Sequence, residues 1–227
     1  MSGHALVAGE PVAIVGDVHG ESERLASVLA SQVIKGRRLI FVGDYIDRGP
    51  DSKGVLDLLV ELQETCDRLV LLRGNHEVAL IQWLRESESP SRFLANRGAT
   101  TIRSYMPNPG PNVLEDFRRE FPPDHLALLE RTLAYAEAPD LLITHGGYNL
   151  GNLGSRAEED LLGCSSWAEL VSTVERPRDL VVVGHHVQPS AVPFDSPGLI
   201  GIDTGAGTFA EGPLTVLLLP EREFHAF

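Results

Sequence analysis

The sequence predicts an α/β protein in which a mostly parallel sheet is covered by helices. Two observations support this class. Short, continuously apolar segments alternate with amphipathic segments of helical period over the first third of the chain, and the connections between them are short. The apolar segments also end in polar clusters, as strands do when ligands bind beyond their carboxyl ends.

The N-terminal third is expected to form a βαβαβ unit. The predicted strands are PVAIVGD (11–17), RLIFVGD (38–44) and DRLVLLRGN (67–75). Between them, residues 21 to about 33 and residues 51–63 place apolar side chains on one helical face. Short connections of this kind favour parallel strands with helical crossovers.

A different pattern follows the third strand. Residues 77–138 carry aromatic and charged residues, with helix-like stretches at 113–121 and 124–136. We interpret this segment as a helical insertion lying over one edge of the sheet. Because the chain shows no repeat, low-complexity segment or clear linker, we expect residues 1–227 to form a single domain.

Strand signals return in the C-terminal third. The expected strands there are PDLLITHGG (139–147), DLVVVGHH (179–186), SAVPF (190–194), GLIGIDTG (198–205) and PLTVLLLP (213–220). The stretch GIDTGAG resembles a glycine-rich phosphate loop, but it lacks a lysine and a following helix. We therefore interpret it as a strand-to-turn segment near the site.

Composition narrows the classes of function. The 227 residues include 43% hydrophobic and 22% charged residues, which is typical of a globular protein. A net charge of −13 argues against a protein that wraps nucleic acid, because that function needs many Lys and Arg side chains. It does not argue against a phosphate substrate, since bound metal ions can make the local electrostatic potential positive. The chain has no membrane-length apolar run and no signal-peptide pattern. With Cys66 and Cys164 expected to be buried, reduced thiols, we expect a cytoplasmic protein.

Polar clusters follow five of the predicted strands, and we expect them to form one shared site. Six side chains in these clusters are candidate metal ligands: Asp17, His19, Asp44, Asn75, His145 and His185. Carboxylate, amide and imidazole ligands suit Mn, Fe or Zn. Six ligands are too many for one ion with an open position, so two ions sharing Asp44 are expected. Alternatively, Asp17 and Asp44 are helix N-caps, a common use of aspartate.

Five motifs resemble the signature blocks of the calcineurin-like metallophosphoesterases: GDVHG (16–20), GDYIDRGP (43–50), RGNHE (73–77), THGG (144–147) and GHH (184–186). Their details are similar to the serine/threonine phosphoprotein-phosphatase branch, which includes compact bacterial enzymes. The C-terminal segment is similar also to relatives that cleave diadenosine tetraphosphate. The resemblance implies a four-layer αββα sandwich with mixed sheets and a helical insertion.

The resemblance also implies a role for each metal ligand. Asp17 and His19 would hold the first ion and Asp44 would bridge both ions. The second ion would be held by Asn75, His145 and His185. His186 competes with His185, and the position directly after glycine favours His185. Two divalent ions are therefore the expected cofactors, Mn²⁺ first, with Fe or Zn as alternatives.

The remaining roles concern the substrate. By resemblance, His76 is the general acid that protonates the leaving oxygen, and Asp47 orients its imidazole. Arg48 and Arg73 would contact the phosphate as forked donors. A structural use of each remains the alternative, with Asn75 and His76 forming a turn and Arg48 pairing with a nearby acid.

One departure from the family pattern bears on the substrate. A further phosphate-binding arginine usually follows the HGG block, whereas here Arg156 and Arg176 are the nearest candidates and neither lies in a recognisable position. We expect hydrolysis of phosphoserine or phosphothreonine in proteins by direct attack of metal-bound hydroxide. The alternatives are a symmetrical dinucleoside tetraphosphate hydrolase and, from another class, a non-catalytic binding or regulatory domain. The sequence does not indicate the oligomeric state.

Overall fold

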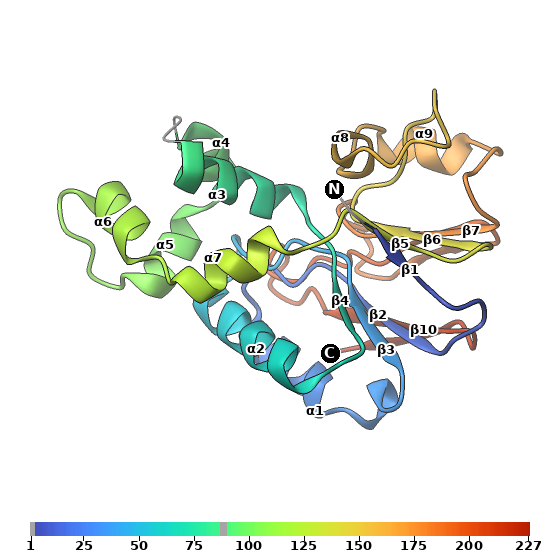
Figure 1. The fold of residues 1–227 in the computed structure, drawn as a ribbon, viewed down its shortest axis with the longest axis horizontal. Helices are drawn as coiled ribbons and strands as arrows, with labels where there is room; N and C mark the ends of the chain where they lie inside the picture. Colours follow the sequence, from blue (N-terminus) through green and yellow to red (C-terminus); the bar gives the residue numbers. More distant parts are fainter. Residues whose placement is uncertain (1–2, 87–89) are drawn as a thin grey trace.

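Two stacked β-sheets with helices on both outer faces form the core of the protein (Figure 1). The computed structural model describes residues 3–86 and 90–227. Helices α1 (Ser22–Ala30) and α2 (Ser52–Thr65) cover one sheet, whereas α8 (Glu158–Leu161) and α9 (Trp167–Ser172) lie over the other. The four-layer arrangement with mixed sheets is confirmed.

The first sheet contains the predicted βαβαβ unit. Its five strands, in the order β11-β10-β2-β3-β4, are Glu223–Ala226, Thr215–Leu219, Val12–Val15, Arg38–Phe41 and Leu69–Leu71. Strands β2, β3 and β4 are parallel, while β10 pairs antiparallel with both β2 and β11. The predicted strands are present but shorter, because their polar ends turn away from the sheet to form loops.

The second sheet has six strands in the order β1-β5-β6-β7-β9-β8. They are His4–Ala5, Tyr135–Glu137, Leu141–Thr144, Leu180–Val183, Leu199–Gly201 and Phe194–Ser196. Strands β6, β7 and β9 are parallel, whereas β5 and β8 are antiparallel to their neighbours β6 and β9. The expectation of one mostly parallel sheet is therefore wrong, because the strands are divided between two mixed sheets.

The core between the sheets explains why the strands read as continuous apolar runs. Ile14 and Ile40 of the first sheet meet Ile143 and Val182 of the second in one buried cluster. The alternate residues, such as Val15, face the outer helices and are equally buried. The central strands, such as β2, β9 and β10, thus bury both of their faces, which removes the usual polar-apolar alternation.

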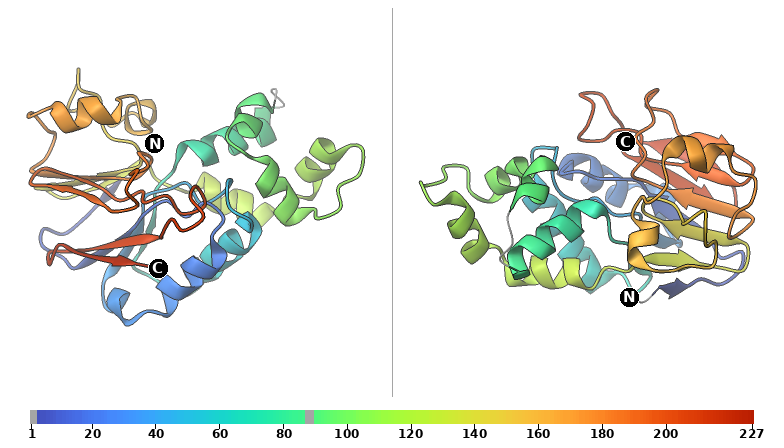
Figure 2. Two further views of the ribbon diagram at one scale, coloured as in Figure 1. Left: turned by 180° about the vertical axis from the view of Figure 1, so that it is seen from behind. Right: turned by 90° about the horizontal axis from the view of Figure 1, so that it is seen from above.

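The expected helical insertion projects from one end of the sandwich (Figure 2). It contains α3 (Asn75–Glu86), α4 (Ser91–Ala95), α5 (Ala99–Tyr105), α6 (Val113–Glu120) and α7 (Pro123–Glu130). Its core is a group of aromatic rings, in which Trp83 stacks on Phe93 and Phe117 with centroids 5.1 and 5.7 Å apart. Helices α5 and α7 pack against α2, so the insertion is continuous with the first sheet's helical layer.

Some predicted details are wrong. The helix expected over 124–136 ends at Glu130, because the backbone that follows joins the second sheet as β5. The insertion likewise stops before residue 138. Cys66 is only half-buried and Cys164 is exposed; both are free thiols. In the part of the chain that the structure describes, no helix combines the length and apolar character needed to cross a bilayer.

Phe93 tests how much the aromatic group stabilises the insertion. We expect Phe93→Ala to lower the free energy of unfolding by about 3–5 kcal/mol, since the ring is fully buried. The neighbouring Leu94→Ala is the control, because Leu94 is 38% exposed and should cost much less. Urea denaturation measures both; equal losses would contradict the packing described here.

Candidate metal centre and catalytic site

Strand ends from both sheets meet at one edge of the sandwich and bring the predicted ligands together. Asp17 follows β2, Asp44 follows β3, and His185 follows β7. The amide of His185 donates to both carboxylate oxygens of Asp17, at 3.1 and 3.0 Å. Nε2 of His19 lies 3.5 Å from Oδ2 of Asp44, and Nε2 of His145 lies 3.4 Å from Oδ1 of the same carboxylate. Asp44 is therefore the shared centre of the cluster.

Unusual backbone conformations concentrate at this edge. Five predicted site residues have positive φ angles: His19 (43°), Asp44 (53°), Asp47 (70°), Arg48 (64°) and His185 (59°). Non-glycine residues occupy this region at an energetic cost, and such positions cluster at functional sites. The fold therefore stores strain where the candidate ligands converge.

Two glycines of the motifs are required by close packing against ligands. A Cβ atom on Gly74 would lie 2.0 Å from Oδ1 of Asp44, and one on Gly184 would lie 2.1 Å from Oδ1 of Asp17. Both distances are far below van der Waals contact. Any side chain there would displace a carboxylate from the site.

The imidazoles of His19 and His145 are oriented by backbone carbonyls. Nδ1 of His19 lies 2.9 Å from the carbonyl of Ile46, and Nδ1 of His145 lies 3.1 Å from that of Val42. With Nδ1 donating the proton, Nε2 presents its lone pair to the interior of the site. This arrangement is typical of metal-binding histidines.

Asn75 and His185 complete the cluster. Oδ1 of Asn75 lies 3.1 Å from Nε2 of His145 and 2.9 Å from Nδ1 of His185. His186 points elsewhere: its Nε2 lies 3.0 Å from the carbonyl of Gly146, and its ring packs on Trp167. The structure thus places His185, and not His186, beside the other candidate ligands.

Burial determines the protonation of the site. It lowers the pKa of His19 and of His145, and lowers the pKa of His185 to about 3. Burial alone would raise the pKa of Asp44, but the surrounding imidazoles, His145 first, hold it below its ordinary value. Burial and the nearby carboxylate of Asp203 raise the pKa of Asp17 well above its usual range. Imidazoles of lowered pKa beside crowded carboxylates form a site that a cation would stabilise.

The residues present fit divalent metal ions. Two triads have ligand atoms within 4.8 Å of one another, namely His19-Asp44-His76 and Asp44-His145-His185. Nε2 of His19 and Oδ2 of Asp44 are buried, and neither has a hydrogen-bond partner in the described parts of the chain. Buried polar atoms rarely lack partners, and a bound cation would supply one. The imidazole, carboxylate and amide donors suit Mn, Fe or Zn.

His76 and Asp47 form a hydrogen-bonded pair beside this cluster. Nδ1 of His76 lies 2.7 Å from Oδ2 of Asp47, while Nε2 lies 3.7 Å from Oδ2 of Asp44. Burial alone would lower the pKa of His76, but Asp44 and the bond to Asp47 raise it. The imidazole therefore retains a proton more readily than a free histidine and presents Nε2 to the site.

The structure adds Thr101 of α5, which sequence reasoning missed. Its hydroxyl donates to Oδ1 of Asp47 at 2.5 Å and accepts the amide of Asp47 at 3.0 Å. Ser52 also accepts that amide at 3.0 Å. The insertion therefore orients the partner of His76. No local signal identified Thr101, since it lies 54 residues from Asp47.

Asp203 is a second addition, from the segment interpreted as a turn. Its Oδ1 accepts the amide of Gly205 at 3.0 Å, while its buried Oδ2 has no hydrogen-bond partner among the described residues. Burial raises its pKa to about 6, and its charge acts on Asp17. The position of GIDTG after a strand was the signal available for finding it.

The two predicted arginines have different surroundings. Nη1 of Arg48 donates to Oγ1 of Thr208 at 2.8 Å, and its Nη2 lies 3.4 Å from Nε2 of His76. In contrast, Nη2 of Arg73 donates to the carbonyl of Glu130 at 2.8 Å, and Nη1 lies 3.3 Å from Oε2 of Glu158. Arg48 therefore borders the site, whereas these bonds direct Arg73 to the ends of α7 and α8.

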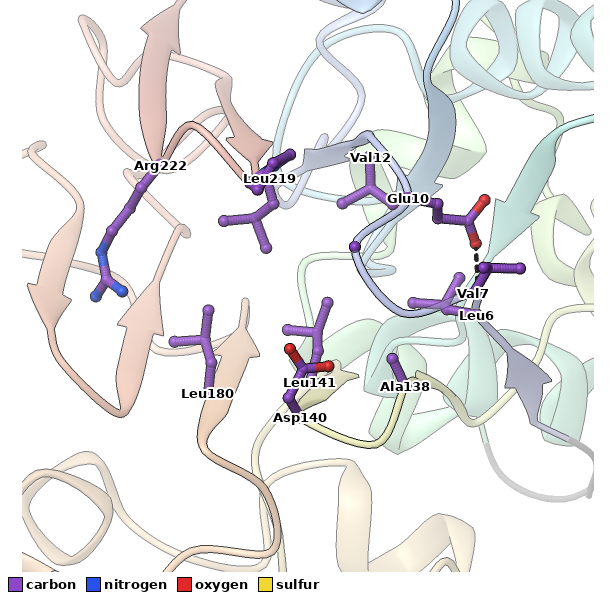
Figure 3. Close-up of a pocket in the computed structure, with 12 residues that line it drawn as sticks. Leu6, Val7, Glu10, Val12, Ala138, Asp140, Leu141, Leu180, Leu219 and Arg222 are labelled. Carbon is purple, nitrogen blue, oxygen red and sulfur yellow. Dashed lines mark hydrogen bonds between the residues drawn. The ribbon is translucent and has the colours of Figure 1, made fainter.

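A cavity lies at the end of the sandwich opposite the candidate ligands (Figure 3). Its volume is about 210 Å³, and Val12, Leu141 and Leu180, which line it, are the first residues of β2, β6 and β7. The candidate ligands follow the last residues of these parallel strands. This largely apolar cavity is therefore separate from the site.

Comparison with known proteins agrees with this geometry. The model of the family described as calcineurin-like phosphoesterase matches residues 10–211. The chain belongs to this family. It is a family of hydrolases that use divalent metal ions.

Relatives with different recorded activities resemble this calcineurin-like phosphoesterase. The bis(5'-nucleosyl)-tetraphosphatase PrpE [asymmetrical] of Oceanobacillus iheyensis is 27% identical over 93% of this chain and 89% of its own. The serine/threonine-protein phosphatase 4 catalytic subunit of Kluyveromyces lactis is 45% identical, but the match covers 31% of this chain and only 24% of that relative's length.

A solved structure supports the fold. The cold-active protein-tyrosine phosphatase of a Shewanella species superimposes with a TM-score of 0.64 at 18% identity, covering 100% of this chain and 82% of its own. Identity at this level indicates the shared architecture alone.

The metal fit can be tested without turnover. We expect Mn²⁺ to raise the melting temperature of chelator-treated protein. An ion that binds only the folded state adds about 2.7 kcal/mol to the free energy of unfolding when its concentration is 100 times its Kd. Asp44→Asn should remove most of the increase in melting temperature, since Asp44 belongs to both triads. The control is Asp67→Asn on the exposed surface. A full rise in Asp44→Asn, measured by scanning calorimetry, would refute the shared centre.

Thr101→Val tests the support of Asp47. The change preserves shape but leaves the buried amide of Asp47 with one acceptor fewer, which costs about 1–3 kcal/mol of stability. We expect kcat on p-nitrophenyl phosphate to fall roughly tenfold with little change in KM, since Thr101 acts through Asp47. Thr65→Val at the exposed end of α2 is the control. An unchanged kcat in Thr101→Val would show that the insertion does not act through the His76–Asp47 pair.

Proposed function

We propose that this protein is a two-metal phosphoesterase that hydrolyses phosphoserine or phosphothreonine in proteins. The observation that carries the proposal is the pairing of His76 with Asp47 directly beside Asp44, the residue shared by both candidate metal triads. A proton donor next to a two-cation site is the combination that phosphate-ester hydrolysis requires.

The metal ligands have distinct proposed places. Asp17 and His19 would hold one ion and Asp44 would bridge, while the second ion would be held by Asn75, His145 and His185. When bound, two divalent ions, Mn²⁺ in our proposal, activate water and neutralise the charge of the phosphate. The carbonyls of Ile46 and Val42 keep the histidines in the tautomer that this role needs.

The other residues act on the substrate. His76 donates the proton at Nε2 to the leaving oxygen, and Asp47 stabilises the charged imidazole from the Nδ1 side. Arg48, within 3.4 Å of His76, binds the phosphate oxygens. Arg73 remains a proposed second contact, and binding phosphate would require it to exchange its bonds to α7.

Support for the protein substrate comes from the 45% identity to a protein phosphatase over 73 residues. The second candidate substrate is a dinucleoside tetraphosphate, favoured by the match to a tetraphosphatase over 93% of this chain. A non-catalytic binding domain is disfavoured because the His76–Asp47 pair and all six candidate ligands are present together. We place the enzyme in the cytoplasm of a bacterial-type cell.

A paired assay tests the proposal. Chelator-treated protein supplied with Mn²⁺ is given a phosphothreonine peptide or diadenosine tetraphosphate, and the products are identified. We expect phosphate release from the peptide, and a 10²–10⁴-fold loss of kcat in His76→Asn with Mn²⁺ binding retained. His225→Asn on β11 is the control. Turnover of the dinucleotide alone would select the second candidate, and no turnover of either would reject both.

A further inference from the structure

A cavity of about 300 Å³ opens beside His76 and Arg48. Its described lining comes from the site and from the insertion: Arg48, His76, Ala95, Asn96, Arg97, Val187 and Thr208. Arg48 and His76 belong to both the site and the cavity. A molecule reacting at the site would therefore extend into this space.

The lining has the charge of an anion-binding pocket. It includes two guanidinium groups, Arg48 and Arg97, and no carboxylate among the described lining residues. The chain as a whole has 32 acidic and only 19 basic residues, so such a lining departs from the average surface. His76 provides the one aromatic ring of that lining. Recognition would therefore depend on charge and hydrogen bonds rather than on stacking.

The backbone of Arg97 is held in a strained conformation. Its φ angle is 65°, and five of the other seven non-glycine residues described with positive φ are the site residues named above. The turn that carries it, between α4 and α5, is fixed by bonds from the amides of Arg97 and Gly98 to the carbonyls of Leu94 and Phe93, both 3.1 Å. These hydrogen bonds hold the strained backbone of Arg97 and so fix the point from which its side chain extends.

The guanidinium of Arg97 is available for a ligand. The side chain is exposed, and within residues 3–86 and 90–227 no hydrogen bond or ion pair engages it. The arginines considered from the sequence are engaged elsewhere: Arg156 pairs with Glu137 at 2.9 Å, and Arg176 donates to the carbonyl of Thr173 at 2.7 Å. Of these three arginines, Arg97 is the one whose guanidinium lines the cavity and makes no hydrogen bond or ion pair with another described residue.

The position of His76 shows which part of a substrate enters the cavity. As the proton donor, Nε2 must face the leaving oxygen, and His76 also lines the cavity. The cavity is then on the leaving-group side of the phosphate. A serine or threonine side chain brings no charge to that side, whereas the next phosphate of a phosphoanhydride does.

We propose that Arg97 forms a subsite for a phosphate-bearing leaving group, which adds the phosphoanhydride bonds of nucleoside polyphosphates to the bonds that this site can cleave. This rests on the proposed phosphoesterase function and extends it to the second substrate class. Water adds to phosphorus and loses a proton to solvent, and the bond from phosphorus to the bridging oxygen breaks. That oxygen keeps the electron pair and takes the proton from Nε2 of His76, while Arg97 neutralises the departing phosphate.

Arg97→Gly tests the subsite without threatening the fold, because glycine adopts the positive φ angle freely. We expect KM for diadenosine tetraphosphate to rise roughly tenfold or more, the effect of losing one charge-assisted hydrogen bond, with p-nitrophenyl phosphate unaffected. The KM of Arg97→Lys for diadenosine tetraphosphate should lie between those of the wild type and Arg97→Gly. Arg131→Ala is the matched control, since its guanidinium likewise makes no hydrogen bond to another described residue and lies away from this cavity.

Binding of ADP to the Mn²⁺-loaded protein, measured by calorimetry at fixed free Mn²⁺, needs no turnover. We expect roughly tenfold weaker binding in Arg97→Gly and none of this loss in Arg131→Ala. Equal ADP affinity in wild type and Arg97→Gly would overturn the subsite. So would a loss confined to phosphothreonine peptides with acidic flanks. If p-nitrophenyl phosphate is not hydrolysed at all, the phosphoesterase function fails, and ADP binding still decides the subsite.

Discussion

The buried carboxylate of Glu77 joins the two loops on which the rest of the site depends. Its Oε2 accepts the amides of Asp44 and Gly74 at 2.8 and 2.9 Å, and its Oε1 accepts the amide of Tyr45 at 2.9 Å. Asp44 and Tyr45 follow β3, whereas Gly74 precedes α3, which begins with Asn75 and His76. Burial raises the pKa of Glu77 to about 7. One side chain therefore sets the position of the Asp44 carboxylate relative to His76.

The loop after β2 is aligned with this pair by backbone bonds. The amides of Val18 and His19 both donate to the carbonyl of Asp44, at 3.0 and 2.8 Å. The strained backbones of His19 and Asp44 thus hold each other, and the cost of strain is offset by the hydrogen bonds and burial around them. A site assembled this way needs little rearrangement to receive cations, because its donors already converge on Asp44.

Much of this site could be predicted from the sequence because its residues directly follow strong strand signals. Asp17, Asp44 and His145 lie one to three residues beyond apolar runs, and parallel strands gather their carboxyl ends. The features that the sequence did not predict are either very short or formed by residues far apart in the chain. Strand β5 covers Tyr135–Glu137, too few residues to show a period, and it is defined by pairing with β6. Thr101 reaches Asp47 only through the packing of α5 on α2, which no local pattern encodes.

The insertion, which was the least predictable part of the chain, contributes to the site through the start of α3, which carries Asn75 and His76, and through α5 with the turn before it. Thr101 lies in the first turn of α5 and fixes Asp47, and Arg97 lies two residues before that helix beside His76. Both depend on the packing of Phe93, whose ring would contact any Cβ at Gly98. A change in the insertion's core would therefore move Asp47, the partner of His76, and the proposed leaving-group pocket together. We therefore propose that substrate choice and proton transfer are coupled through α5, whereas five of the six candidate metal ligands follow strand ends outside the insertion and only Asn75 lies in it, at the start of α3.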